Sequence, residues 1–248
     1  MNKDTNMNKV IKVSIFVFIL IFFSHDLFAA DILFNMDFSS RYIWRGFDLN
    51  PYRKPVIQPS LDWKIGQSGL SINIWSSLSF VSKEFNEVDL TLSYGKELTK
   101  GLLMETGLIH YAWYFTEDFE FKDDTSHEFF VSLGFPKIFF SPSLVFFYDF
   151  TVGDGFYTQL DIGYSLEVQK SFSAGLHSSL GYNGGQWLAE GVDAGFSDLN
   201  FSSSLVWDVG RLSLGASAHW TIVLLDAIGQ ENHFWFKISL SLNVKGRE

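Results

Sequence analysis

The chain has 248 residues, of which 18% are aromatic and only 19% charged, and it contains no cysteine. The lack of cysteine excludes disulfides, thiolate metal sites and a lipidated N-terminal cysteine. The net charge of −10 argues against nucleic acid as a partner, because phosphates are bound by basic surfaces.

Residues 1–30 predict a secretory signal peptide. Three lysines lie near its start, and residues 13–23 form an apolar run in which Ser14 is the only polar residue. The segment ends in the small residues Ala29 and Ala30. The run is shorter than the ~20 apolar residues that a spanning helix needs. We therefore expect cleavage near residue 30 and a mature domain at 31–248. Loss of three lysines and two aspartates changes the net charge from −10 to −11.

The rest of the chain alternates apolar and polar residues with a period of two, which is typical of strands with one apolar face. In the final segment, for example, Phe236 and Ile238 lie on one face and Lys237 and Ser239 on the other. The pattern predicts an all-β chain of about twelve strands, with ten or fourteen as alternatives. The expected spans are 32–47, 55–66, 69–80, 87–95, 102–115, 126–136, 138–151, 156–168, 171–183, 197–209, 211–225 and 232–244.

The connections between these strands alternate between short and long. The short ones carry several lysines and fall at 66–69, 95–101, 136–137, 169–170 and 210. The others are acidic and mostly longer, at 47–54, 81–86, 116–125, 152–155, 184–196 and 226–231. Short turns on one rim and longer loops on the other are typical of a transmembrane β-barrel. In the strand at 102–115, Glu105 and Gly107 share a face with Ile109 and Tyr111, so we expect a bulge or register shift there.

Alternation alone also fits a soluble sandwich or a lipocalin-type barrel with its apolar faces inside. The polar faces, however, consist mainly of Ser, Gly, Asn, Gln and His, whereas a face exposed to water would carry more Lys and Glu. In an up-and-down order, the aromatics of the apolar faces fall at two heights, as expected at two lipid–water interfaces. We therefore predict an antiparallel transmembrane β-barrel with an aromatic girdle of Tyr42, Trp44, Trp63, Tyr94, Tyr148, Tyr164, Tyr182, Trp207 and Trp220.

The segment SSRYIWRG at residues 39–46 is followed by KPVIQPSLDW, SGLSINIWSS and NEVDLTLSYG. Over about residues 31–95 this order resembles the TorF-type porin family. That family shows a Tyr-x-x-Arg-Gly motif, a Pro-x-x-Gln-x-x-x-Asp-aromatic strand, a Gly-rich strand with Trp and an acidic-x-Asp strand start. The matching positions are Tyr42, Arg45, Gly46, Pro55, Gln58, Asp62, Trp63, Trp75, Glu87 and Asp89. Arg41 replaces an expected acidic residue, and the chain ends NVKGRE without a terminal aromatic. The resemblance implies an outer-membrane channel whose solute is poorly defined.

The polar face of such a barrel lines a narrow lumen, which is either filled with water or with side chains. The candidate pore-lining residues are Arg41, Arg45, Lys237, Asp62, Asp89, Asp149, Asp161, His177 and His219. Closure pairs the last strand with the first, so we expect Lys237 to join Arg41 and Arg45 in a basic wall. Asp89, Asp149 and Asp161 would form an acidic wall farther round. Two interpretations follow: a transverse field across a constriction, or internal ion pairs that close the lumen.

Together these features predict a porin of the Gram-negative outer membrane for passive diffusion of small hydrophilic solutes, with no catalytic residues, cofactor or metal. The expected partners are outer-membrane lipid, lipopolysaccharide and the barrel-assembly machinery, and the oligomeric state stays open. The alternatives are a structural or adhesin-like closed barrel and an outer-membrane lipid hydrolase. A hydrolase would need a serine beside His177 on its face, where only Ser179 qualifies, and the match to a lipase motif is poor. The acidic loop at 116–124 lacks the oxygen spacing of a calcium site.

Overall fold

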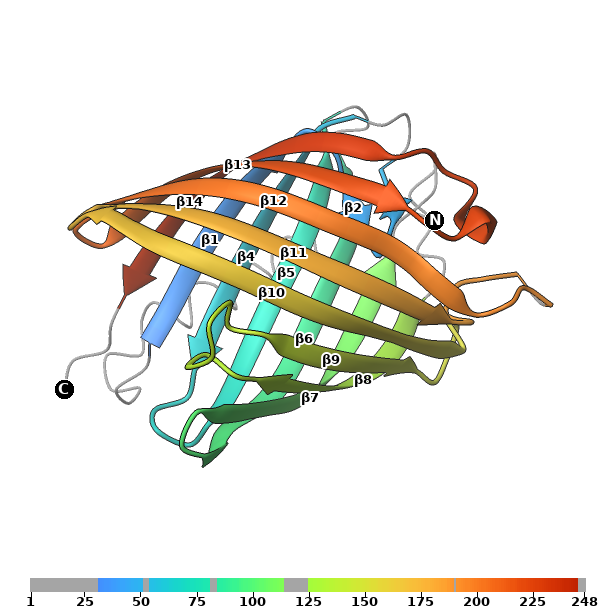
Figure 1. The fold of residues 1–248 in the computed structure, drawn as a ribbon, viewed down its shortest axis with the longest axis horizontal. Helices are drawn as coiled ribbons and strands as arrows, with labels where there is room; N and C mark the ends of the chain where they lie inside the picture. The colour runs from blue at the N-terminus through green and yellow to red at the C-terminus, as the bar shows by residue number, and fades with distance from the viewer. Residues whose placement is uncertain (1–30, 51–53, 81–83, 114–124, 190, 245–248) are drawn as a thin grey trace, which may run out of the picture.

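The computed structural model describes residues 31–50, 54–80, 84–113, 125–189 and 191–244; the predicted signal peptide at 1–30 and the acidic loop at 116–124 lie outside this part. Twelve strands close into one antiparallel barrel (Figure 1), which confirms the predicted fold class. They are β1 (Asp31–Ser39), β4 (Val56–Lys64), β5 (Leu70–Ser79), β6 (Glu84–Thr99), β7 (Leu102–Trp113), β8 (Thr125–Gly134), β9 (Ser143–Asp149), β10 (Gly155–Gln169), β11 (Phe172–Gly184), β12 (Gly195–Val209), β13 (Leu212–Val223) and β14 (His233–Val244). Two short strands, β2 (Ile43–Trp44) and β3 (Phe47–Asp48), pair separately.

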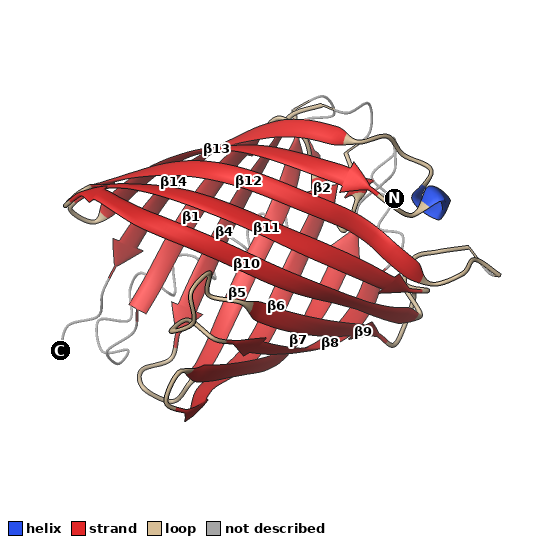
Figure 2. Ribbon diagram, in the orientation of Figure 1, coloured by secondary structure: helices blue, strands red, loops and turns tan. Residues whose placement is uncertain are grey.

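The barrel strands follow one another in chain order, and β14 closes the wall by pairing with β1. This seam runs from the pair Ile32 and Val244 to the pair Ser39 and Lys237. Figure 2 shows a wall made of strands, and the short 3-10 helix η2 (Asp226–Ile228) lies between β13 and β14. None of the helical structure in the described ranges is long and apolar enough to cross a membrane.

The outward face of the barrel is apolar. Residues paired directly across strands share a face, so Leu108 of β7, Phe129 of β8 and Tyr148 of β9 form one outward row. Their side chains are 52%, 39% and 44% exposed. Similar apolar rows continue round the barrel, and such an exterior suits contact with lipid hydrocarbon. Closure of the barrel also pairs the backbone groups that an open sheet edge would leave without partners in lipid.

The two rims of the barrel differ as the sequence predicts. At the turn rim, where β1 begins and β14 ends, most connections are tight, at 65–69, 100–101, 170–171 and 210–211. The opposite rim, called the loop rim below, carries the connections 40–55, 80–83, 114–124, 150–154, 185–194 and 224–232. The tight turn expected at 136–137 is wrong, because β9 is short and residues 135–142 form the connection. Gly163 N donates to Phe140 O (2.7 Å), and Phe139 packs on Tyr164, so this connection lies against β10.

Two expectations about individual strands are also wrong. The register between β7 and β8 is continuous from Leu103 to Ala112, and the shift between β6 and β7 lies instead at Glu97 and Thr99. Ile109 and Tyr111 share the inward face with Gly107, where the ring of Phe130 occupies the space that a Cβ would need. The lumen is therefore partly apolar at this level. The first strand, expected at 32–47, ends at Ser39, and the chain then leaves the barrel wall.

Most of the predicted aromatic girdle lies on the outward face. The exposed fractions are 38–52% for the five most open members: Tyr94, Tyr148, Tyr164, Trp207 and Trp220. Trp63 pairs with Ile32 and Ile72 on that face, and Tyr182 packs between Phe156 and Phe196. Tyr42 and Trp44 are exceptions and lie inside the barrel, so their assignment to the girdle is wrong.

Candidate functional site

A β-hairpin that begins where β1 ends projects into the lumen. Ser39 Oγ donates to the carbonyl of Arg41 at 2.6 Å, and Leu49 N donates to Tyr42 O at 2.8 Å, which fixes the bend and the two arms. Arg45 (φ 50°) and Gly46 (φ 87°) form the tip, both in the left-handed region that the commonest two-residue hairpin turn requires. A Cβ on Gly46 would lie 3.0 Å from Ile228 Cδ1 and 3.3 Å from Asp198 Cβ, so only glycine fits without displacing its neighbours. Residues 40–50 are called the lumen hairpin below.

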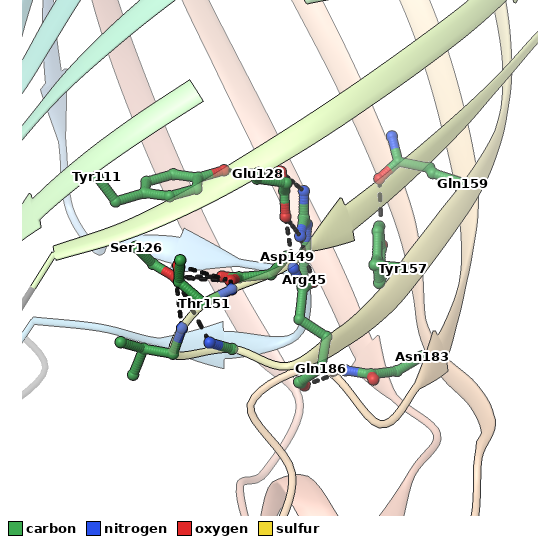
Figure 3. Close-up of polar contacts among 12 residues, drawn as sticks. Arg45, Tyr111, Ser126, Glu128, Asp149, Thr151, Tyr157, Gln159, Asn183 and Gln186 are labelled. Carbon is green, nitrogen blue, oxygen red and sulfur yellow. Dashed lines mark hydrogen bonds and ion pairs between the residues drawn. The ribbon is translucent and has the colours of Figure 1, made fainter. Parts of the chain in front are cut away.

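Arg45 at the tip reaches the opposite wall. Its Nη1 and Nη2 donate to Glu128 Oε2 and Oε1 at 2.7 and 2.8 Å, in a bidentate pair. The Arg45 side chain is 6% exposed and that of Glu128 is 0% exposed. Glu128 lies on β8, with four strands between it and β1 on one side of the barrel and six on the other. The lumen hairpin therefore reaches across the lumen from β1 to β8, and Figure 3 shows its tip residue Arg45 beside Glu128.

Aromatic rings and polar groups surround the Arg45 guanidinium. Its Cζ lies 4.1 Å from the ring centre of Phe147, 4.5 Å from that of Trp44 and 4.6 Å from that of Tyr157. Arg45 also donates to the amide oxygen of Gln186, and the amide nitrogen of Gln186 donates in turn to Glu128. These contacts offset the desolvation of the buried ion pair through charge-assisted hydrogen bonds and cation–π attraction.

Glu128 and Gln186 are themselves held by neighbouring groups. The hydroxyl of Tyr111 donates to Glu128 Oε1 at 2.9 Å. The amide of Asn183 donates to the carbonyl of Gln186 at 2.9 Å and fixes the start of the β11–β12 loop (Figure 3). Every acceptor oxygen of the Glu128 carboxylate thus has a donor, which is the condition for a buried carboxylate to be tolerated.

A second group of contacts fixes the base of the lumen hairpin. The hydroxyl of Tyr42 donates to Glu87 Oε2 at 2.5 Å, and Trp113 Nε1 donates to Glu87 Oε1 at 2.8 Å. The ring of Tyr42 packs on Trp75 at 5.4 Å. Within the hairpin, Arg41 pairs with Asp48 at 3.2 Å. The hairpin is therefore anchored at its base as well as at its tip.

The part of the lumen near the loop rim is filled. Polar residues from strands all round the barrel are buried at this level, with exposures of 0–4%: Ser39, Ser77, Ser79, Glu87, Ser126, Glu128, Asp149, Asn183, Ser197, Asp198, Thr221 and His233. Asp149, for example, accepts hydrogen bonds from Ser126 at 2.6 and 2.7 Å. Glu128, for example, is covered by Arg45 of the lumen hairpin and Gln186 of the β11–β12 loop.

Between the filled part and the turn rim, the lumen is more open and polar. Lys237 pairs with Asp37 at 3.1 Å, and Asp161 pairs with His177 at 3.0 Å. A cavity of about 280 Å³ opens along β12, β13 and β14, and its polar lining includes Ser202, Ser204, Ser217, His219, Lys237 and Ser239. Hydroxyl groups both donate and accept hydrogen bonds, so this wall can replace water around a hydrophilic solute.

The structure distributes the predicted pore-lining residues over these two levels. Asp62, Asp161, His177, His219 and Lys237 lie on the inward face of the open part, whereas Asp149 lies in the filled part and Asp89 close to it. The prediction of a basic wall formed by these three cations is wrong. Lys237 pairs with Asp37, Arg41 pairs with Asp48, and Arg45 crosses to Glu128, because the chain leaves the wall at Ser39.

The main partners of the lumen hairpin were not predicted as site residues. They are Glu87, Glu128, Tyr157 and Gln186. One signal was available: Gly46 between two aromatics is a residue that the second position of a two-residue hairpin turn favours. The alternation does predict that Glu128 on β8 faces inward, but no local signal reports its pairing with Arg45, 83 residues away.

No family model matches the chain, so the TorF-type resemblance stays a prediction. No curated protein matches it either. Among solved structures, the chain is similar to the KdgM porin (9% identity, TM-score 0.56), over 86% of this chain and 98% of that one. It is also similar to the NanC porin (12%, TM-score 0.52, 87% and 100%) and to an outer membrane channel from Pseudomonas putida F1 (9%, TM-score 0.52, 87% and 95%). At these identities the likeness concerns the fold, and the chain thus has the fold of outer-membrane β-barrel porins.

Proposed function

We propose that this chain is an outer-membrane channel for passive diffusion of small hydrophilic solutes, in which the lumen hairpin forms the constriction. The observation that carries the proposal is the polar, hydroxyl-rich lumen, which contains a cavity of about 280 Å³ below the hairpin. A barrel that served only as a wall would gain stability from an apolar interior, because polar side chains need partners or water. Lys237 lines this cavity and pairs with Asp37 at 3.1 Å.

The orientation in the membrane follows from the rims. Residues 1–30 would direct export, and both ends of the barrel domain would lie in the periplasm with the turn rim. The loop rim and the lumen hairpin would then face the outside, and the aromatic girdles would contact lipid and lipopolysaccharide. Assembly would require the barrel-assembly machinery. The comparisons support this proposal through the fold of the porins they name.

A planar-bilayer experiment tests the proposal. Purified protein is expected to give discrete conductance steps in KCl, with a reversal potential in a salt gradient that reports ion selectivity. Liposomes containing the protein should swell in small sugars and stop swelling as solute size increases. Empty liposomes and heat-unfolded protein are the controls. A folded barrel that conducts no ions and passes no solute would contradict the proposal.

A second candidate is a closed structural barrel, and the ion pair between Arg45 and Glu128 favours it. Both side chains are buried, and the contacts of the lumen hairpin reach both walls. The two candidates differ in one respect: a channel should respond to weakening of the hairpin, whereas a structural barrel should stay silent or unfold.

A further inference from the structure

Two histidines lie side by side on the outer surface of the barrel near the loop rim. His110 of β7 and His127 of β8 are direct cross-strand partners. Two residues away, the pair Leu108 and Phe129 is 52% and 39% exposed on the outward face, and His110 and His127 share that face because side chains alternate. β7 ends three residues after His110, at Trp113. The imidazoles therefore lie on the membrane-facing side, close to the loop rim.

The backbone places these two side chains as near as cross-strand neighbours can be. His127 N donates to Thr151 Oγ1 at 2.7 Å, and His127 O accepts from Phe150 N at 3.1 Å. Both main-chain groups of His127 point toward β9, so its pairing with His110 is of the non-hydrogen-bonded kind, in which side chains are closest. The ring centres are 4.9 Å apart, and the ring of Phe150 stacks on His127 at 6.0 Å, which restricts its rotation.

We propose that His110 and His127 form a binding site for a divalent first-row transition metal such as Zn²⁺, Ni²⁺ or Cu²⁺. His110 Nδ1 and His127 Nε2 are 3.1 Å apart. Zinc–nitrogen bonds of about 2.0–2.1 Å in a tetrahedral site place two nitrogen ligands about 3.3 Å apart, so the spacing fits the ion once both rings turn their lone pairs toward it. Water completes the coordination. Imidazole suits these ions, whereas Mg²⁺ and Ca²⁺ prefer oxygen ligands.

Metal binding at the two histidines requires no net gain or loss of protons by the protein. Without metal, one of the two facing nitrogens carries a proton and donates it to the lone pair of the other. A metal ion requires both lone pairs, so the donor ring moves its proton to its other nitrogen, as neutral imidazole tautomers allow. An anionic lipid phosphate would instead require both facing nitrogens to donate. The close contact between a donor and an acceptor nitrogen favours the cation.

Calorimetry with ZnSO₄ and spin resonance with CuSO₄, on detergent-solubilised protein without a histidine tag, test the site. We expect one saturable site per barrel, nitrogen hyperfine splitting from two imidazoles, and a rise in unfolding temperature with Zn²⁺, because the ion binds the folded state. His110→Gln and His127→Gln should each abolish the saturable binding and the temperature shift. His177→Gln removes a lumen imidazole and should change neither.

Several results would overturn the assignment. They are binding that survives in the double variant His110→Gln/His127→Gln, no binding to correctly folded wild-type protein, or a stabilising effect of inorganic phosphate in place of Zn²⁺. Folding of each variant is checked by its shift in gel mobility on heating, so loss of binding through unfolding is distinguished from loss of the ligands. The outcome is independent of whether the barrel conducts.

Discussion

The substitution Glu128→Gln tests whether the lumen hairpin is held in place by its ion pair. Glutamine keeps the shape of the side chain but replaces one oxygen by an amide group and removes the charge. Each Glu128 oxygen accepts from Arg45 and from a second donor, Tyr111 at Oε1 and Gln186 at Oε2. Whichever oxygen is replaced, the new amide NH₂ group, itself a donor, then faces two donors from which it cannot accept a hydrogen bond.

The expected effect is large because Arg45 stays buried without a countercharge. Removal of one partner of a buried ion pair costs about 3–5 kcal/mol. At about 1.4 kcal/mol for each tenfold change, the equilibrium between the bound and the released hairpin shifts by two to four orders of magnitude toward the released state. The aromatic rings around Arg45 lower this cost only in part, since a cation–π contact contributes about 0.5–2 kcal/mol and the rings remain in both proteins.

Single-channel recording measures the result. Glu128→Gln is expected to raise the mean conductance or the open fraction well above that of the wild type. Asp208→Asn is the matched control: it neutralises a carboxylate on β12 near the turn rim, whose partner is Ser213 and not the hairpin. Arg45→Met with Glu128→Leu should return toward the wild type, because apolar replacement of a buried ion pair is often neutral. Unchanged conductance in a folded Glu128→Gln barrel would refute the reasoning.

Three further predictions concern other parts of the barrel. Gly46→Val should open the lumen as Glu128→Gln does, because a left-handed backbone strains a β-branched residue by about 1–3 kcal/mol and its Cβ meets Ile228; the same recordings check it. Lys237→Met should shift the reversal potential in a KCl gradient toward cation selectivity, since it leaves Asp37 without its cation, and an unshifted potential would exclude Lys237 from the ion path. Ile238→Arg, at a lipid-facing position that is 62% exposed, should lower the free energy of unfolding in urea by about 2–4 kcal/mol, and equal stability would mean that this face does not contact lipid.

The sequence predicts the barrel wall well because the wall obeys a local rule. Side chains alternate across a strand, so each segment reports its own two faces, and a lipid-facing residue such as Ile238 is recognised without knowledge of its neighbours. The prediction for the wall is wrong where the length of a strand depends on packing. β9 is shorter than its alternation suggests, because residues 135–142 lie against β10.

The lumen hairpin escaped prediction for a different reason. Tyr42 and Trp44 have the same parity as Met36 and Phe38 in β1, so the alternation continues through the bend at Ser39. Period two cannot distinguish an aromatic that faces lipid from one that packs on Trp75 inside the barrel. The positive φ of Arg45 and its distant partner are decided by tertiary contacts, which a single sequence does not report.

The seam between β1 and β14 constrains the order in which parts of the barrel can fold. Lys237 and Asp37, which pair across it, are 200 residues apart, so this junction cannot form until the last strand has been synthesised. Joining ends that far apart costs about 2–3 kcal/mol more in chain entropy than closing a ten-residue loop. The lumen hairpin begins at the end of β1, at this junction, and its tip is bound to β8. The tip contact joins residues only 83 positions apart, so it can form before the seam closes, and the hairpin can then serve as an internal support on which the last strands assemble.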